Sequence, residues 1–154
     1  MGISTDAILF YGYCWDEETN LFGEGEERYQ EWEHIILKKR GFSSPWDSYP
    51  VKDAAIKKWK EDNKTATDEW NRWKNNLKEE FGGVDIYHHC SAEYTIPYIT
   101  ASRIEAHRGY PKEITPHLLG RIVGWDDSLD KFLDALDIPK PHSVPKWWLV
   151  SYWG

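Results

Sequence analysis

Apolar and polar positions divide the chain into short runs typical of strands and longer runs typical of helices. Five runs are rich in β-branched and aromatic residues and end at acids, glycines or prolines, which is the pattern of strands. These runs cover residues 7–15, 84–90, 93–100, 103–108 and 145–153. The first run is apolar on both faces, so we expect it to lie in the centre of a sheet.

Three longer segments carry apolar residues at helical spacing. They cover residues 27–40, 52–81 and 127–137. The apolar stripe of the middle segment stays in phase along its length and consists of Ile56, Trp59, Ala66, Trp70, Trp73, Leu77 and Phe81. This phase favours one continuous helix, whereas Thr67 is a good N-cap residue and favours a break. We therefore expect a helix over 52–81 with a kink near residues 62–67.

Strands at both ends and in the middle of the chain, separated by long helices, predict an α+β fold. We expect a single mixed sheet of about four or five strands with the helices packed on it. Trp70 and Trp73 share one helical stripe, so we expect both to be buried against this sheet. The length is typical of one domain, so residues 1–154 are expected to form a single globular domain.

The last strand contains two adjacent tryptophans that cannot point the same way. One face of residues 145–153 holds Trp147, Leu149, Ser151 and Trp153, and the other holds Trp148, Val150 and Tyr152. Either the strand is buried on both sides, or one face is open to a partner.

Several motifs at both ends and in the middle of the chain resemble small proteins of actinobacterial phages. The motifs are G-I-S-T-D-x-I-L-x-Y-G-Y, then H-C-S-x-x-Y, then R-G-Y-P, and a tail of the form P-x-W-x-L-x-S-Y-W. The resemblance implies the cytoplasm of an infected bacterium as the setting. It implies no particular chemistry, because that family has no agreed activity.

Tryptophan and acidic residues dominate the composition. Ten tryptophans are more than one small core needs, which favours a binding surface. The net charge is −7, and the acids concentrated between Asp16 and Glu33 repel phosphate, so direct binding of nucleic acid is not expected. Lysines alternate with tryptophans on the middle helix, but acids interrupt them, and an ordinary amphipathic helix accounts for both.

The sequence shows no sign of a membrane span, a secretion signal or a catalytic motif. Its longest apolar run is far shorter than the ~18 residues of a membrane span. The first residues lack a basic region and a cleavage site, so we expect a cytoplasmic location. A phosphate-binding glycine loop, a hydrolase elbow and a zinc motif are all absent from the sequence.

Histidine and cysteine at residues 88–90 are metal-ligating types. Alternation along a strand puts at most two of these side chains on one face, and two ligands do not make a zinc site, so no metal or cofactor is expected. A nucleophilic pair of Cys90 with His107 or His117 has nothing nearby in sequence that lowers the thiol pKa. We expect Cys14 and Cys90 to be reduced, buried and unreactive.

These observations favour a phage-type accessory protein that binds a host or defence-system protein with a basic surface, without catalysis. Acidic mimicry of nucleic acid is one form that this action could take. The expected contact residues are aromatics that provide area and acids that steer the partner. They are Tyr13, Trp15, Glu17, Glu18, Glu26, Glu27, Trp32 and Trp148.

The alternative is a small enzyme, or a protein that binds a small molecule or nucleotide. Its pocket would lie near His88, His89, Tyr94 and Arg108. A concave polar pocket that joins these side chains would favour this alternative, whereas an exposed aromatic patch would favour a binding protein.

Overall fold

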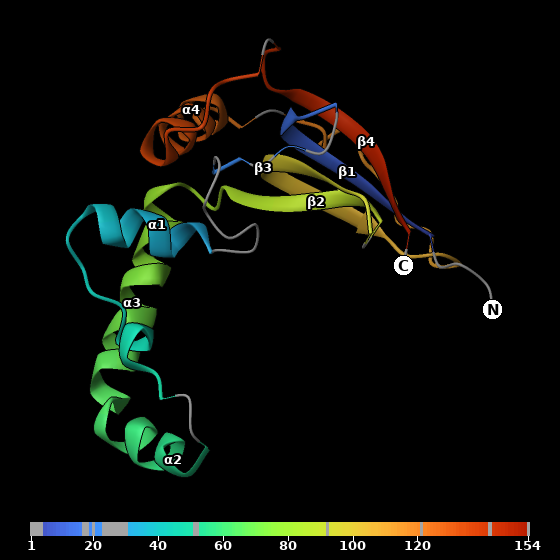
Figure 1. The fold of residues 1–154 in the computed structure, drawn as a ribbon. Coiled ribbons are helices and arrows are strands. Elements are labelled where there is room, and N and C mark those ends of the chain that lie inside the picture. The colour runs from blue at the N-terminus through green and yellow to red at the C-terminus, as the bar shows by residue number, and fades with distance from the viewer. Residues whose placement is uncertain are drawn as a thin grey trace. The chain divides into compact units, whose positions relative to one another are not determined.

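The computed structural model describes residues 5–16, 19, 21–22, 31–50, 53–91, 93–120, 122–141 and 143–153. The contacts divide the chain into two compact units, one formed by Met1–Arg28 with Phe81–Gly154 and the other by Tyr29–Glu80. The first unit contains the strands and one helix, and the second is helical (Figure 1). The α+β class predicted from the sequence is confirmed. The acids expected to steer a partner lie outside the described residues, namely Glu17, Glu18, Glu26 and Glu27.

The first unit is built on a mixed sheet of four strands. These strands are β1 (Thr5–Cys14), β2 (Asp85–Ser91), β3 (Thr95–Ala106) and β4 (Lys146–Trp153). They are ordered β1-β3-β2-β4, and the sheet closes on itself as a barrel. Antiparallel ladders join β1 to β3 and β4, and β2 to β3, whereas β2 meets β4 in a short parallel ladder. β1 is paired on both sides, as is every strand of the closed sheet, so the sheet has no central strand to compare with the position predicted for the first run.

β3 is one strand, where the sequence predicts two separate strands over 93–100 and 103–108. Tyr11 of β1 is paired with Ser102 and Gly12 with Thr100, so Ala101 is an extra residue that forms a β-bulge. The hydroxyl of Thr100 lies 3.0 Å from the Tyr11 carbonyl oxygen and accepts the Ser102 N–H at 3.1 Å. The Thr100 hydroxyl therefore forms hydrogen bonds with backbone groups that lack a ladder partner at the bulge, and the strand continues past it.

The inner face of the barrel holds an apolar cluster formed by Ile8, Phe10 and Tyr98. The Phe10 and Tyr98 rings are stacked with centroids 4.1 Å apart. Partly buried side chains that pack against this cluster are Cys14, Tyr87, Trp148, Val150 and Tyr152.

The helix α4 (Trp125–Leu136) packs on the opposite, outer face of the sheet. Its buried residues are Leu129, Phe132, Leu133 and Leu136. Tyr11 and Tyr13 point to this face and donate hydrogen bonds of 2.9 Å to the α4 residues Asp126 and Asp130. The predicted helix over 127–137 is therefore present, and it begins two residues earlier, after Gly124.

The second unit contains α1 (Trp32–Lys39), the 3-10 turn η1 (Pro45–Ser48), α2 (Asp53–Asp62) and α3 (Lys64–Glu80). Of the helix predicted over 27–40, residues 27–30 lie outside the described part. The helix predicted over 52–81 is divided at Asn63, inside the region where we expect a kink. The Asn63 side-chain amide and its backbone N–H both donate to the Trp59 carbonyl oxygen, at 3.0 and 2.9 Å. This side chain competes for a helical acceptor, which is a common cause of a bend.

Trp70 is fully buried, as the sequence predicts, and Trp73 is half-buried. The Trp70 indole N–H donates to His34 Nε2 of α1 at 3.1 Å, and Trp73 packs against Phe42 with ring centroids 4.4 Å apart. Within the second unit, these tryptophans therefore pack against α1 and the segment after it. In the described part of the chain, no helix combines the length and the apolar character needed to cross a bilayer.

Candidate functional site

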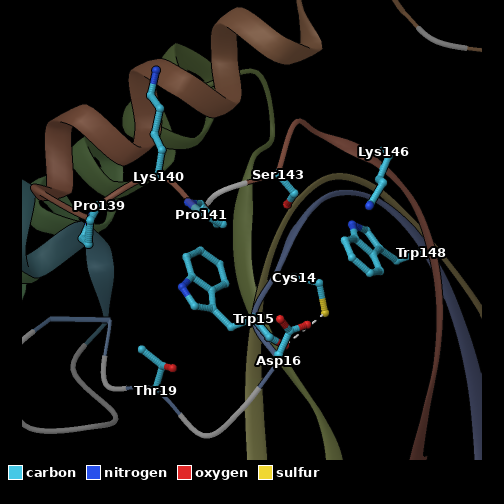
Figure 2. Close-up of a pocket in the computed structure, with 10 residues that line it drawn as sticks. All are labelled: Cys14, Trp15, Asp16, Thr19, Pro139, Lys140, Pro141, Ser143, Lys146 and Trp148. Atoms are coloured by element: carbon cyan, nitrogen blue, oxygen red, sulfur yellow. Dashed lines mark hydrogen bonds between the residues drawn. The ribbon is translucent and has the colours of Figure 1, made fainter.

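A hollow of about 620 Å³ lies in the first unit, where β1 ends and β4 begins. Its lining residues are Cys14, Trp15, Asp16, Thr19, Pro139, Lys140, Pro141, Ser143, Lys146 and Trp148. Figure 2 shows the Trp15 side chain beside Pro141, with Trp148 on the side of β4. The structure thus brings together Trp15 and Trp148, two of the aromatic residues that the sequence analysis selected.

Trp148 is held in place by the strand beside it. Its indole N–H donates to the Gly12 carbonyl oxygen at 3.0 Å, and its ring packs against the inner cluster. The Lys146 ammonium lies 4.5 Å from the centre of the same ring, in a cation–π contact. One indole face is therefore occupied by a cation, and Trp148 contributes to the core as well as to the hollow.

Lys140 at the rim of the hollow is bound to α4. Its ammonium lies 2.9 Å from Asp130, which also accepts the hydroxyl of Tyr13. Burial opposes ionisation of Asp130, but the hydrogen bonds from Lys140 and Tyr13 outweigh it and lower the pKa of this carboxyl. Burial, followed by the hydrogen bond to Asp130, raises the pKa of Tyr13. These groups fix the rim to α4.

A cysteine and a histidine meet on the inner face next to the hollow. Cys14 Sγ lies 3.5 Å from His89 Nε2. Burial, with smaller contributions from Asp16 and Cys90, raises the pKa of the Cys14 thiol to about 11. Burial also lowers the pKa of His89, with His88 acting in the same direction. Both groups are therefore neutral at pH 7, unlike the thiolate–imidazolium pair of a cysteine nucleophile.

The thiol of Cys14 should react slowly with a maleimide in the folded protein at pH 8, in a Cys90→Ser variant that leaves one thiol. The pKa of this thiol is about 11 in the wild type, and burial, its main cause, is unchanged in the variant, so the thiolate fraction at pH 8 is far below that of an unperturbed thiol. Stopped-flow labelling across pH should show a rate that keeps rising up to that pKa. The same variant unfolded in urea is the control, and equal rates in the two states at pH 8 would contradict the pKa shift.

The two faces of β4 differ in how far they are covered, and the strand is not buried along both faces. Its inner residues pack against the core cluster. On the outer face, Trp147 contacts Tyr11 and Trp125, whereas Leu149 is 74% exposed and Trp153 is 55% exposed. The outer face of β4 is thus covered by α4 at one end and is open towards the other.

Two predicted contact residues belong to the core instead. Tyr13 and Trp32 are each 4% exposed, because Tyr13 lies under α4 and Trp32 is on the buried side of α1. The expectation that they provide exposed contact area is wrong. Spacing along the chain did not show that Tyr13 is bound to Asp130, which is distant in sequence.

The alternative pocket predicted near His88, His89, Tyr94 and Arg108 is not formed. Tyr94 precedes the first residue of β3 and Arg108 follows its last, so the length of a twelve-residue strand separates them. His88 and His89 are on β2 near the Tyr94 end, with His89 on the inner face beside Cys14. Arg108 lines a different hollow with Asp6 and His107.

The second unit carries an aromatic cluster that the sequence analysis did not predict. Trp46, Tyr49 and Trp59 pack together, with ring centroids 4.9 to 5.7 Å apart. Trp46 is 43% exposed and Tyr49 is 41% exposed. The Trp59 indole N–H donates to Ser48 of η1. The sequence predicts that Trp59 lies on a helix, but its spacing does not predict the contacts that Trp59 makes with η1 and the residue after it.

Comparison of the chain with protein-family models, with curated proteins and with solved structures finds no match.

Proposed function

We propose that this protein acts by binding another protein through the open outer face of its sheet. The observation that carries this proposal is the exposure of Leu149 and Trp153 on β4, at 74% and 55%. Strand residues with large apolar side chains are normally covered, and an uncovered apolar face is typical of a contact surface.

The neighbouring strands extend this face. Leu9 of β1 is paired with Leu149 on one side and with Ile104 of β3 on the other, so the three side chains form one apolar row. Leu9 and Ile104 are half-buried. The next row, towards the open end, consists of Ser151, Ala7 and Ala106. We call these two rows and Trp153 the outer patch, which is uncharged and suits an apolar surface of a partner.

Charge favours a partner whose apolar contact is flanked by basic groups. The net charge of −7 attracts such a partner over distance, while the outer patch provides the contact area. A bacterial host protein or defence protein is the class of partner that the resemblance to phage proteins supports. The acidic segment that follows Trp15 remains part of this proposal as a steering element.

The hollow beside Trp15 supports a second candidate, a site for a small ligand. Its volume of about 620 Å³ lies in the range of ligand sites, and two indoles line it. Lys146 would attract an anionic group on a ligand with a flat ring. A ligand of this site should lose affinity on Trp15→Ala and be insensitive to changes in the outer patch, which separates the two candidates.

A Leu149→Asp variant should lose partner binding. Immobilised wild-type protein is used to capture a partner from host lysate, and the purified partner is then titrated against both proteins. A carboxylate in the centre of the patch should weaken binding by more than about tenfold, because its desolvation opposes contact. Val144→Asp is the matched control, since Val144 is 75% exposed but lies in the loop before β4. Equal affinity of the Leu149→Asp variant and the wild type would contradict the proposal.

A further inference from the structure

Three metal-ligating side chains meet at the end of the barrel where β1 begins and β3 ends. Ala7 is paired with Ala106, and continuing this antiparallel register puts Asp6 opposite His107. Glu105 is two residues before His107, so it points to the same face of the sheet. This is the inner face, because Glu105 is paired with the core residue Ile8.

The three side chains are close enough to share one ion. One ligand atom from each of Asp6, Glu105 and His107 lies within 4.8 Å of the other two. His107 Nδ1 is 3.2 Å from Asp6 Oδ2. An ion with ligand bonds of about 2.0–2.2 Å keeps its ligand atoms about 3–4 Å apart, so small side-chain movements complete the geometry. In the described part of the chain, these are the three residues that meet this condition.

Arg103 holds the Glu105 carboxylate from the side of the core. Its guanidinium lies 2.7 Å from Glu105 Oε2, donates to the Tyr98 hydroxyl at 2.9 Å, and stacks 4.5 Å from the centre of the Tyr87 ring. A carboxylate has two oxygens, so Glu105 can bind Arg103 with one oxygen and an ion with the other. Outer partners of this kind orient metal ligands.

An ion can reach this place and keep water ligands there. The side chains of Asp6 and Glu105 are 21% and 29% exposed, and that of His107 is 64% exposed. A hollow of about 480 Å³ lies beside Asp6 and His107, with Tyr110 and Ser151 in its lining. Three protein ligands with room for water are typical of open zinc sites.

The geometry points to a binding site for a divalent transition-metal ion of the zinc type, with Asp6, Glu105 and His107 as ligands. One imidazole nitrogen and two carboxylate oxygens suit Zn²⁺ better than Ca²⁺ or Mg²⁺, which prefer oxygen ligands alone. The three ligand side chains point to the face of the sheet opposite the outer patch, although Ala7, Ala106 and Ser151 of that patch also line the hollow beside Asp6 and His107.

Titration of the metal-free full chain with Zn²⁺ alone, followed by calorimetry, tests this inference. We expect one ion per chain, and we expect His107→Ala and Asp6→Asn each to weaken binding by at least about tenfold, a typical effect of losing a ligand or its outer partner. His117→Ala is the control, because His117 is an exposed histidine in the segment after β3. Circular dichroism shows whether each variant is folded, and His107→Ala should fold because this side chain is mostly exposed.

Two results would overturn the site. One is wild-type protein that takes up no Zn²⁺ at micromolar concentration. The other is Zn²⁺ binding that survives both His107→Ala and Asp6→Asn but is lost on Cys14→Ser, because the ion would then be held by thiols elsewhere in the barrel. Titration of Co²⁺ gives an independent readout, since its visible absorption spectrum reports nitrogen and oxygen ligands differently from thiolates.

Discussion

Replacing Gly12 by alanine should abolish the native sheet of the first unit. A Cβ atom at this position would lie 1.9 Å from the Ile99 carbonyl oxygen and 3.0 Å from the Thr100 Cα. Both are backbone atoms of the neighbouring strand, so no side-chain rotation relieves the clash. Gly12 also carries the carbonyl that accepts the Trp148 indole N–H. We expect a loss of at least about 4 kcal/mol, a size that marks a change the structure cannot absorb.

Gly83→Ala is the matched control for this change. Gly83 has φ +79° and nothing within 4 Å of an added Cβ, so its replacement tests conformational strain without a clash. Such strain costs about 1–2 kcal/mol. Unfolding in urea followed by circular dichroism compares the variants, and a Gly12→Ala protein no less stable than Gly83→Ala would show that the strands separate easily at this point.

The sequence predicts the elements well because their signals are local. Alternating and helical patterns placed the strands and the helix over 127–137 within a few residues, and the N-cap character of Thr67 indicated a kink near residues 62–67, although the break is at Asn63 and Thr67 lies inside α3. The continuity of β3 was missed, because the bulge at Ala101 depends on how Tyr11 and Gly12 of a distant strand are paired. A small side chain at residue 101 does not by itself distinguish a bulge from the end of a strand.

The candidate sites depend on which strands pair and in which register. The spacing of residues along the chain does not determine this pairing. Alternation predicted two faces of β4 but not which one is open, because that depends on where α4 packs. The same pairing brought Cys14 to His89, where the sequence analysis had considered Cys90 with other histidines. Asp6 and His107 are neighbours because of the register in which β1 and β3 pair. Residue type indicated the chemistry available, and the sheet register determined which groups meet.

Trp70→Ala should destabilise the second unit by about 3–5 kcal/mol, the range for truncating a buried aromatic side chain. Trp70 is fully buried and packs edge-on against His34, with ring centroids 5.0 Å apart. Its removal leaves a cavity between α1 and α3 and deprives His34 Nε2 of its donor at 3.1 Å. Burial lowers the pKa of His34, so at neutral pH this ring is an uncharged acceptor that the indole N–H satisfies.

Trp46→Ala is the control for loss of an indole from the same unit. Trp46 is 43% exposed, so its truncation should cost well under half as much, although it contacts Tyr49 and Trp59. Thermal unfolding of both variants, followed by near-ultraviolet circular dichroism, gives the comparison. A Trp70→Ala melting temperature within a degree or two of the wild type would mean that α1 and α3 do not depend on this contact. Trp70 would then be buried because the two helices pack together for other reasons, without stabilising that packing itself.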